Sequence, residues 1–135
     1  MKPVMSKQLF TGDYEIHASA KMLYPYIHSA GGLSEWFADN VTINPEKVFT
    51  FSYDNEQHNA VLSGHRTNHF ARFEFVPENE EDEKDPSYFE LRLEPNDFTQ
   101  TVFLKVQDYS DFDDLEELSD LWESLIDKLK KVVGG

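Results

Sequence analysis

The sequence contains no cysteine, and this absence excludes disulfide bonds and thiol catalysis. Any metal site would have to use histidine and carboxylate ligands alone. No run of about 18 apolar residues occurs, so we expect no transmembrane helix. Residues 1–8 also lack the continuous apolar segment of a secretory signal. A chain with these features is expected to reside in the cytoplasm.

Basic residues are scarce. The chain has 12 lysine and arginine residues against 26 aspartate and glutamate residues, which gives a formal net charge of −14. Such a chain repels polyphosphate backbones, because nucleic-acid affinity rests largely on cationic side chains that release counterions. The same argument weakens docking on anionic lipid surfaces. We therefore expect no nucleic-acid partner and no membrane insertion, and we interpret the acidity first as a source of solubility.

Catalytic and metal-binding signatures are also missing. His65 and His69 are four residues apart, but they flank a predicted hairpin, and no glutamate lies between them as in a zincin motif. Residues 108–114 superficially resemble a calcium loop, yet the required glycine is absent. We expect no cofactor, no metal and no catalytic residue.

Large aromatic residues, in contrast, are abundant. The chain has 11 phenylalanine, 6 tyrosine and 2 tryptophan residues, and rings of this size contribute much of the buried area of a core. A chain of 135 residues is long enough to bury roughly 70% of the surface that its unfolded form exposes. Neither a repeat nor an interdomain linker is visible. We predict one domain over residues 1–135.

The last quarter of the chain predicts one long amphipathic helix. Its apolar residues recur at alternating steps of three and four, which places them on one helix face: Leu115, Leu118, Trp122, Leu125, Leu129 and Val132. Ser110 followed by Asp113 resembles an N-terminal capping box. Carboxylates gather near the predicted start and lysines near the predicted end, as the helix dipole favours. Gly134 supplies the predicted stop.

Upstream of this helix the sequence predicts a mostly antiparallel sheet. Residues 9–17 predict a first strand, Ser19 is the expected N-cap of a helix over residues 20–28, and residues 33–38 predict a second short helical turn. Pro25 is expected to kink or shorten the first helix. From about residue 41 to residue 109 the pattern changes to alternation, as in Phe49, Phe51 and Tyr53, which predicts a series of strands with one buried face.

A charged run interrupts this series. Residues 77–87 are bounded by Pro77 and by Pro86-Ser87 and consist almost entirely of charged side chains. Such a run cannot bury itself, so we predict a solvated, mobile hairpin loop. A low-affinity cation site or a docking epitope is the alternative interpretation.

The order strand, helix, short helix, six strands and long helix resembles the helix-grip fold of the START-like, or SRPBCC, superfamily. The segment from Leu33 to Asp39 is similar to the leucine-x-x-tryptophan-phenylalanine segment of the branch named after activators of the heat-shock chaperone ATPase. The resemblance implies an α+β fold: a curved antiparallel sheet of about six to seven strands, with two short helices after the first strand and one long C-terminal helix packed on the sheet.

The resemblance also implies a hydrophobic cavity between the sheet and the long helix. The aromatic content and the lack of paired cationic anchors predict a largely apolar or flat ligand, such as a lipid-like molecule, held by burial. The expected lining residues are Trp36, Phe37, Phe51, Tyr53, Phe73, Phe75, Phe89, Leu91, Phe103, Trp122 and Leu125. Plain packing is the alternative, because this many rings could fill the cavity with their own side chains.

Superfamily members include lipid carriers, cyclases, hormone receptors and chaperone regulators, so the fold does not select an activity. We expect a non-catalytic protein that binds a small hydrophobic molecule. A chaperone-associated or stress-related module that docks a basic protein partner is the second hypothesis. A cyclase-like enzyme is the third, with Tyr53, Arg66 and Arg72 as the available polar groups; Arg66 shares the alternation of Ala60 and Leu62.

Overall fold

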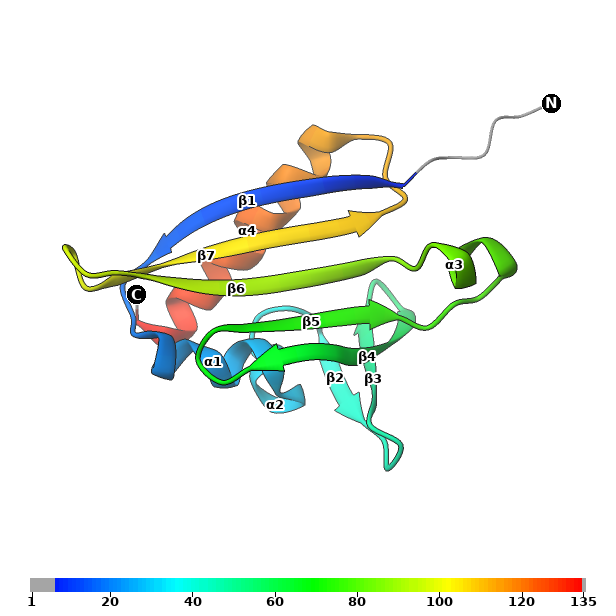
Figure 1. The fold of residues 1–135 in the computed structure, drawn as a ribbon, viewed down its shortest axis with the longest axis horizontal. Helices are drawn as coiled ribbons and strands as arrows, with labels where there is room; N and C mark the ends of the chain where they lie inside the picture. Colours follow the sequence, from blue (N-terminus) through cyan, green and yellow to red (C-terminus); the bar gives the residue numbers. More distant parts are fainter. Residues whose placement is uncertain (1–6, 135) are drawn as a thin grey trace.

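The chain forms one seven-stranded antiparallel sheet, with the long C-terminal helix and the two helices after the first strand on one side (Figure 1). The computed structural model describes residues 7–134, so the N-terminal segment on which the signal-peptide expectation rests lies mostly outside the described residues. The elements, in chain order, are β1 (Gln8–Ile16), α1 (Ala20–His28), α2 (Ala30–Leu33), β2 (Asn40–Ile43), β3 (Val48–Tyr53), β4 (Glu56–Arg66), β5 (Phe70–Phe75), α3 (Glu80–Lys84), β6 (Tyr88–Asn96), β7 (Thr101–Ser110) and α4 (Leu115–Val133).

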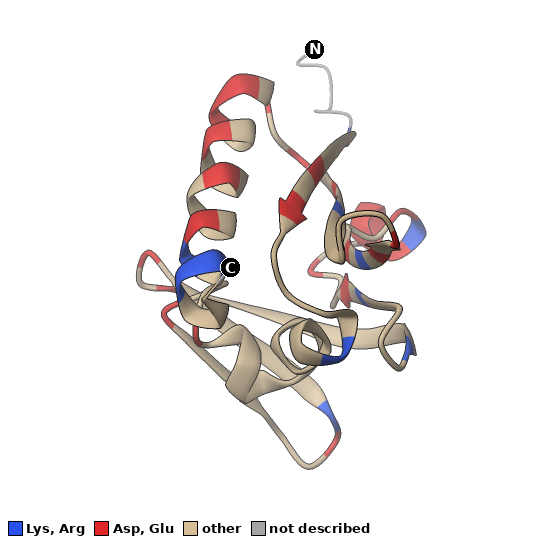
Figure 2. Cartoon of the chain, turned by 90° about the vertical axis from the view of Figure 1, so that its left-hand side faces the viewer, with Lys and Arg blue, Asp and Glu red and all other residues tan. Residues whose placement is uncertain are grey.

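The strand order is β1-β7-β6-β5-β4-β3-β2, so the first strand pairs with the last and the remaining neighbours are consecutive hairpins. The sheet bends toward the side that carries α1, α2 and α4, as the two views show (Figures 1 and 2). This arrangement confirms the predicted α+β helix-grip fold. None of the described helices is both long and apolar enough to cross a membrane.

The first helix has the predicted bounds. The Ser19 hydroxyl accepts a hydrogen bond from the Met22 amide at 3.0 Å and caps α1. Pro25 lies inside α1 without ending it. Ser29 then caps α2 by accepting from the Gly32 amide at 3.0 Å, and its hydroxyl donates to the Pro25 carbonyl at 2.6 Å. The short helix therefore begins at residue 30, earlier than the prediction over residues 33–38.

The long helix begins later than predicted. Ser110 is the last residue of β7, and Asp114 is the N-cap of α4, accepting from the Glu117 amide at 3.1 Å. Gly134 ends the helix in the left-handed conformation, as predicted. The buried face consists of Trp122, Ile126 and Leu129, whereas Leu115 is 56% exposed. The predicted stripe was wrong at that end, where Leu115 is the first residue of α4.

Two irregular segments differ from the sequence prediction. Residues 77–87 are not simply a loop, because Asn79 caps the short helix α3 by accepting from the Asp82 amide at 2.8 Å. Strand β4 carries a bulge between Leu62 and Gly64, and the extra residue reverses the alternation beyond it. Arg66 therefore pairs with Phe70 on the outer face of the sheet. The prediction that Arg66 shares the face of Leu62 was wrong.

Candidate ligand-binding site

The interior between the sheet and the helices is occupied by a cluster of aromatic rings. Phe37, from the turn after α2, is half-buried and packs against this cluster. Its ring centroid is 4.7 Å from that of Phe89, 5.4 Å from that of Phe51 and 5.8 Å from that of Trp122. Phe37 thus joins the sheet to α4 through ring contacts against the core.

All but one of the residues predicted to line a cavity belong to this core or pack against it. The exception is Phe103. On β7, Val102, Leu104 and Val106 face the interior and are buried, and Phe103 alternates with them. Its register partners are Glu15 on β1 and Glu94 on β6. The structure therefore places Phe103 on the outer face of the sheet, away from the other ten.

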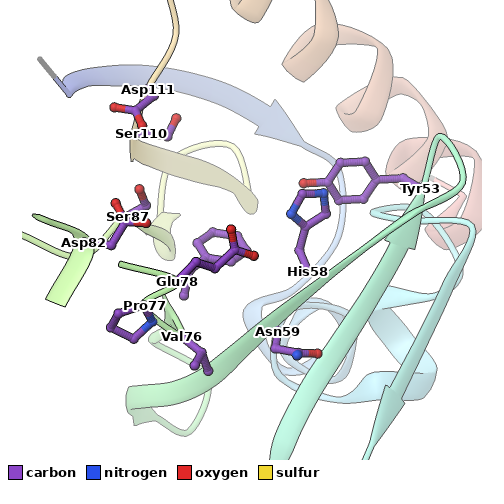
Figure 3. Close-up of a pocket in the computed structure, with 11 residues that line it drawn as sticks. Tyr53, His58, Asn59, Val76, Pro77, Glu78, Asp82, Ser87, Ser110 and Asp111 are labelled. Carbon is purple, nitrogen blue, oxygen red and sulfur yellow. The ribbon is translucent and has the colours of Figure 1, made fainter. Parts of the chain in front are cut away.

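A pocket of about 610 Å³ lies at the end of the sheet where β3, β4, β5 and β7 meet the segment 76–87 (Figure 3). We call it the end pocket. Tyr53 and Phe75 are the only members of the predicted lining that belong to it. Its lining residues are Tyr53, His58, Asn59, Phe75, Val76, Pro77, Glu78, Asp82, Ser87, Ser110 and Asp111.

Local backbone geometry builds the end pocket. Asp54 and Asn55 have positive φ angles of 52° and 62°, as a tight two-residue hairpin turn requires. This turn brings β4 back beside β3, and the His58 ring stacks on the Tyr53 ring at 4.7 Å and 14°. On the other wall, Val76 donates to the Asn59 carbonyl at 2.9 Å, which holds the start of the segment 76–87 against β4.

His58 presents an unpartnered polar atom at this pocket. Its Nε2 is buried and has no hydrogen-bond partner among the described residues. A Glu56 carboxylate oxygen lies 3.4 Å from this nitrogen. That contact is too long for a good hydrogen bond, and the Glu56 side chain is 70% exposed. Leaving a buried polar atom unpaired costs roughly 1–3 kcal/mol.

A family model described as a START-like superfamily domain matches residues 4–135. The chain belongs to the START-like superfamily. No curated protein matches this START-like chain.

Several solved structures are similar to the START-like chain. The Aha1 dimer from Colwellia psychrerythraea aligns over 93% of this chain and 96% of its own, with a TM-score of 0.74 and 14% identity. The protein MLL2253 from Mesorhizobium loti aligns over 94% and 97%, with a TM-score of 0.74 and 15% identity. CalU16 from Micromonospora echinospora aligns over 94% and 74%, with a TM-score of 0.69 and 14% identity. These low identities show the fold alone.

Behind the end pocket of this START-like protein lies a buried carboxylate, Asp108. It accepts hydrogen bonds from Trp122 Nε1 at 3.0 Å and from the Ser110 hydroxyl at 2.9 Å. Burial raises the pKa of Asp108 above its ordinary value, although these two hydrogen bonds act in the opposite direction. Asp108 therefore links β7 to α4 through its hydrogen bond from Trp122. Burial at this position makes the charged form of its carboxyl group less favourable.

Tyr53 is held in its protonated form. Burial, followed by the negative charges of Asp108, Glu56 and Asp54, raises the pKa of Tyr53 to about 12. A phenol with that pKa keeps its proton at neutral pH, so it can donate a hydrogen bond but does not serve as a general base. Among residues 7–134, no group of three or more histidine, aspartate or glutamate side chains could hold a metal ion.

Sequence reasoning missed most of the pocket. His58 lies two residues before Ala60, which is buried on the inner face. This alternation could have predicted that His58 also faces inward. His65 lies beyond the bulge, and its Nδ1 is 3.3 Å from the Tyr24 hydroxyl of α1. It faces the helices because the bulge reverses the alternation of β4. Residues 76–87 had no signal that placed them against β4.

Replacing Asp108 with asparagine should make stability less dependent on pH. Because its pKa is raised in the folded state, the folded protein holds this proton more tightly than the unfolded chain does. The contribution of Asp108 to the free energy of unfolding is therefore most favourable below about pH 4, and it falls as the pH rises through the raised pKa. Asp108→Asn should be more stable than the wild type at pH 7 and equal to it near pH 3.

Urea unfolding at both pH values measures this difference. Asp113→Asn removes the same charge from an exposed side chain and is the matched control. If Asp108→Asn is the less stable variant at pH 7, the hydrogen bonds to the carboxylate outweigh its burial.

Proposed function

We propose that this START-like protein binds a small, flat and largely apolar molecule in the end pocket, without catalysing a reaction on it. The volume of about 610 Å³ lies within the range of small-molecule sites, roughly 300–1,000 Å³. The observation that carries the proposal is a pocket of this size walled by the rings of Tyr53, His58 and Phe75. Cytoplasmic residence is part of the same proposal.

The predicted cavity residues keep a role in this proposal. Phe75 connects the end pocket to the core, because its ring lies 5.8 Å from that of Phe89. Behind it stand the rings of Phe73, Phe51 and Phe37. We propose that the Phe75 ring forms the apolar floor against which a flat ligand packs, that the rings behind it hold it in place, and that the polar groups at the rim orient the ligand.

A panel of fatty acids, sterols and aromatic compounds tests the proposal. We expect at least one class to raise the melting temperature and to shift the amide resonances of Tyr53, His58 and Phe75. His58→Leu keeps an apolar wall but removes the ring that stacks on Tyr53, so affinity should fall by about five-fold, the equivalent of one aromatic contact of about 1 kcal/mol. His69→Leu, in the exposed β4–β5 turn, should bind like the wild type.

Failure of every compound in the panel would sink the proposal and favour the protein-interaction module. That second candidate is supported by α4, where acidic residues recur on successive turns (Figure 2). The exposed ones are Glu116, Glu117, Asp120, Glu123 and Asp127. A basic partner would be steered to such a surface, with charge setting the association rate more than the affinity. The resemblance to chaperone activators suggests a chaperone-associated partner.

A further inference from the structure

We infer that the ligand of the end pocket carries a positive charge: an aromatic or otherwise flat molecule that bears a protonated amine. This inference rests on the proposed function and names the chemical class of its ligand. It starts from the charges of the lining. Glu78, Asp82 and Asp111 contribute carboxylates, and the lining includes neither lysine nor arginine.

Two of the three carboxylates have no ion-pair partner among residues 7–134. Lys7 Nζ lies 3.1 Å from an Asp82 carboxylate oxygen and offsets that charge. Glu78 and Asp111 have no ion-pair partner within 4.0 Å among residues 7–134. In Figure 3, the Glu78 carboxylate points toward the His58 ring, and Asp111 lies across the pocket from it. The pocket therefore has a negative charge on two sides.

The hydrogen-bonding groups of the lining point to the same ligand. Carboxylates only accept hydrogen bonds at neutral pH. The Ser110 hydroxyl already donates to Asp108, so its oxygen presents lone pairs. Acceptors thus outnumber donors around the pocket, and an ammonium group, which donates three hydrogen bonds and accepts none, matches them.

The aromatic wall suits a cation as well as a flat ring. Tyr53 and Phe75 offer ring faces or edges to the ligand, and a cation within about 6 Å of a ring centroid is attracted to its face. The formal net charge of −14 extends the attraction beyond the pocket, because it raises the local concentration of cations. An anion would meet repulsion from Glu78 and Asp111 and no cationic side chain in the lining.

Three ligands with one ring system test the inference on the full chain: 2-naphthylmethylamine, 2-naphthylmethanol and 2-naphthoate. We expect the amine to bind about ten-fold more tightly than the alcohol, and the carboxylate to bind least, by titration calorimetry with amide shifts to locate the site. Raising the salt concentration from about 20 to about 200 mM should weaken the amine alone, because screening acts on charge.

Matched variants separate the pocket from the overall charge. Glu78→Gln with Asp111→Asn should remove most of the preference for the amine over the alcohol. Asp120→Asn with Glu123→Gln makes the same change of charge on the exposed face of α4 and should leave the preference unchanged.

Three outcomes are distinguishable. Equal affinity of the amine and the alcohol overturns the inference and leaves the proposed function standing. An equal loss of preference in both double variants also overturns it, because the overall charge would then be the cause. If none of the three naphthyl compounds shifts a pocket resonance and the wider panel also fails, the proposed function itself is wrong.

Discussion

Replacing Gly32 with alanine should destabilise the protein by about 3 kcal/mol or more, a large fraction of the roughly 5–15 kcal/mol that keeps a typical domain folded. A Cβ atom at Gly32 would lie 2.0 Å from the Pro25 carbonyl oxygen and 2.6 Å from the Tyr26 Cα. Both are backbone atoms of α1, so no side-chain rotation relieves the overlap. The two helices would have to separate.

Separation would also disturb the core beyond α2. Leu33, which is fully buried, ends α2. Trp36 follows, and its Nε1 donates to the Tyr26 carbonyl at 2.9 Å. Moving α2 away from α1 would lengthen this hydrogen bond and displace Phe37 from the ring cluster. The expected loss therefore combines a steric overlap with lost burial.

Gly31 provides the matched control, one residue earlier in the same helix. A Cβ atom there would meet no atom within 4 Å. Gly31→Ala should be neutral or stabilising by about 0.5–1 kcal/mol, because alanine restricts the unfolded chain and favours helix. Urea unfolding followed by tryptophan fluorescence compares the two variants. Equal stabilities would mean that α2 does not pack against α1 as described.

Replacing Phe37 with alanine should cost roughly 2–3 kcal/mol, less than the loss of a fully buried ring, and open an apolar space between the sheet and α4. Phe37 contacts the rings of Trp36, Phe51, Phe89 and Trp122, and the surrounding strands are paired on both sides, so we expect little collapse. An apolar cavity of this kind stays dry and takes up small aromatic molecules. Benzene should therefore raise the melting temperature of the variant and not that of the wild type.

Phe98 is the control for this substitution. It lies in the β6–β7 turn and is 100% exposed, so Phe98→Ala should change the free energy of unfolding by no more than about 0.5 kcal/mol. Similar losses in the two variants would show that the Phe37 ring does not fill the interior. Loss of stability without benzene binding would indicate that the core closes over the space.

The inner positions of the sheet were predictable where strands are regular. Alternation placed Phe49 and Phe51 on the buried face, and Phe89 and Leu91 with them, because successive side chains of a strand point to opposite faces. The prediction failed for Phe103, although its own alternation with Val102 and Leu104 already separated it from the core. A large side chain is not evidence of burial when the alternation of its strand places it on the outer face.

The candidate site was less predictable than the core. Only Tyr53 and Phe75 of the predicted lining belong to the end pocket. Its other wall comes from residues 76–87, whose charged composition predicted a solvated loop. Hydrogen bonds from Val76 to Asn59 and from Phe75 to Ser87 hold this segment in place, and no local pattern encodes contacts between segments so far apart in the chain.

The amino-acid sequence alone determined the elements whose signals are local: the Ser19 cap, the amphipathic C-terminal helix with its Gly134 stop, and the alternating strands that make the fold recognisable. Tertiary structure alone decided the bulge that turns Arg66 outward, the approach of α2 to α1 at Gly32, and the meeting of His58, Glu78 and Asp111 around one pocket. The reason is physical. Periodicity and capping act within a few residues, whereas strand register and close backbone approach depend on partners elsewhere in the chain.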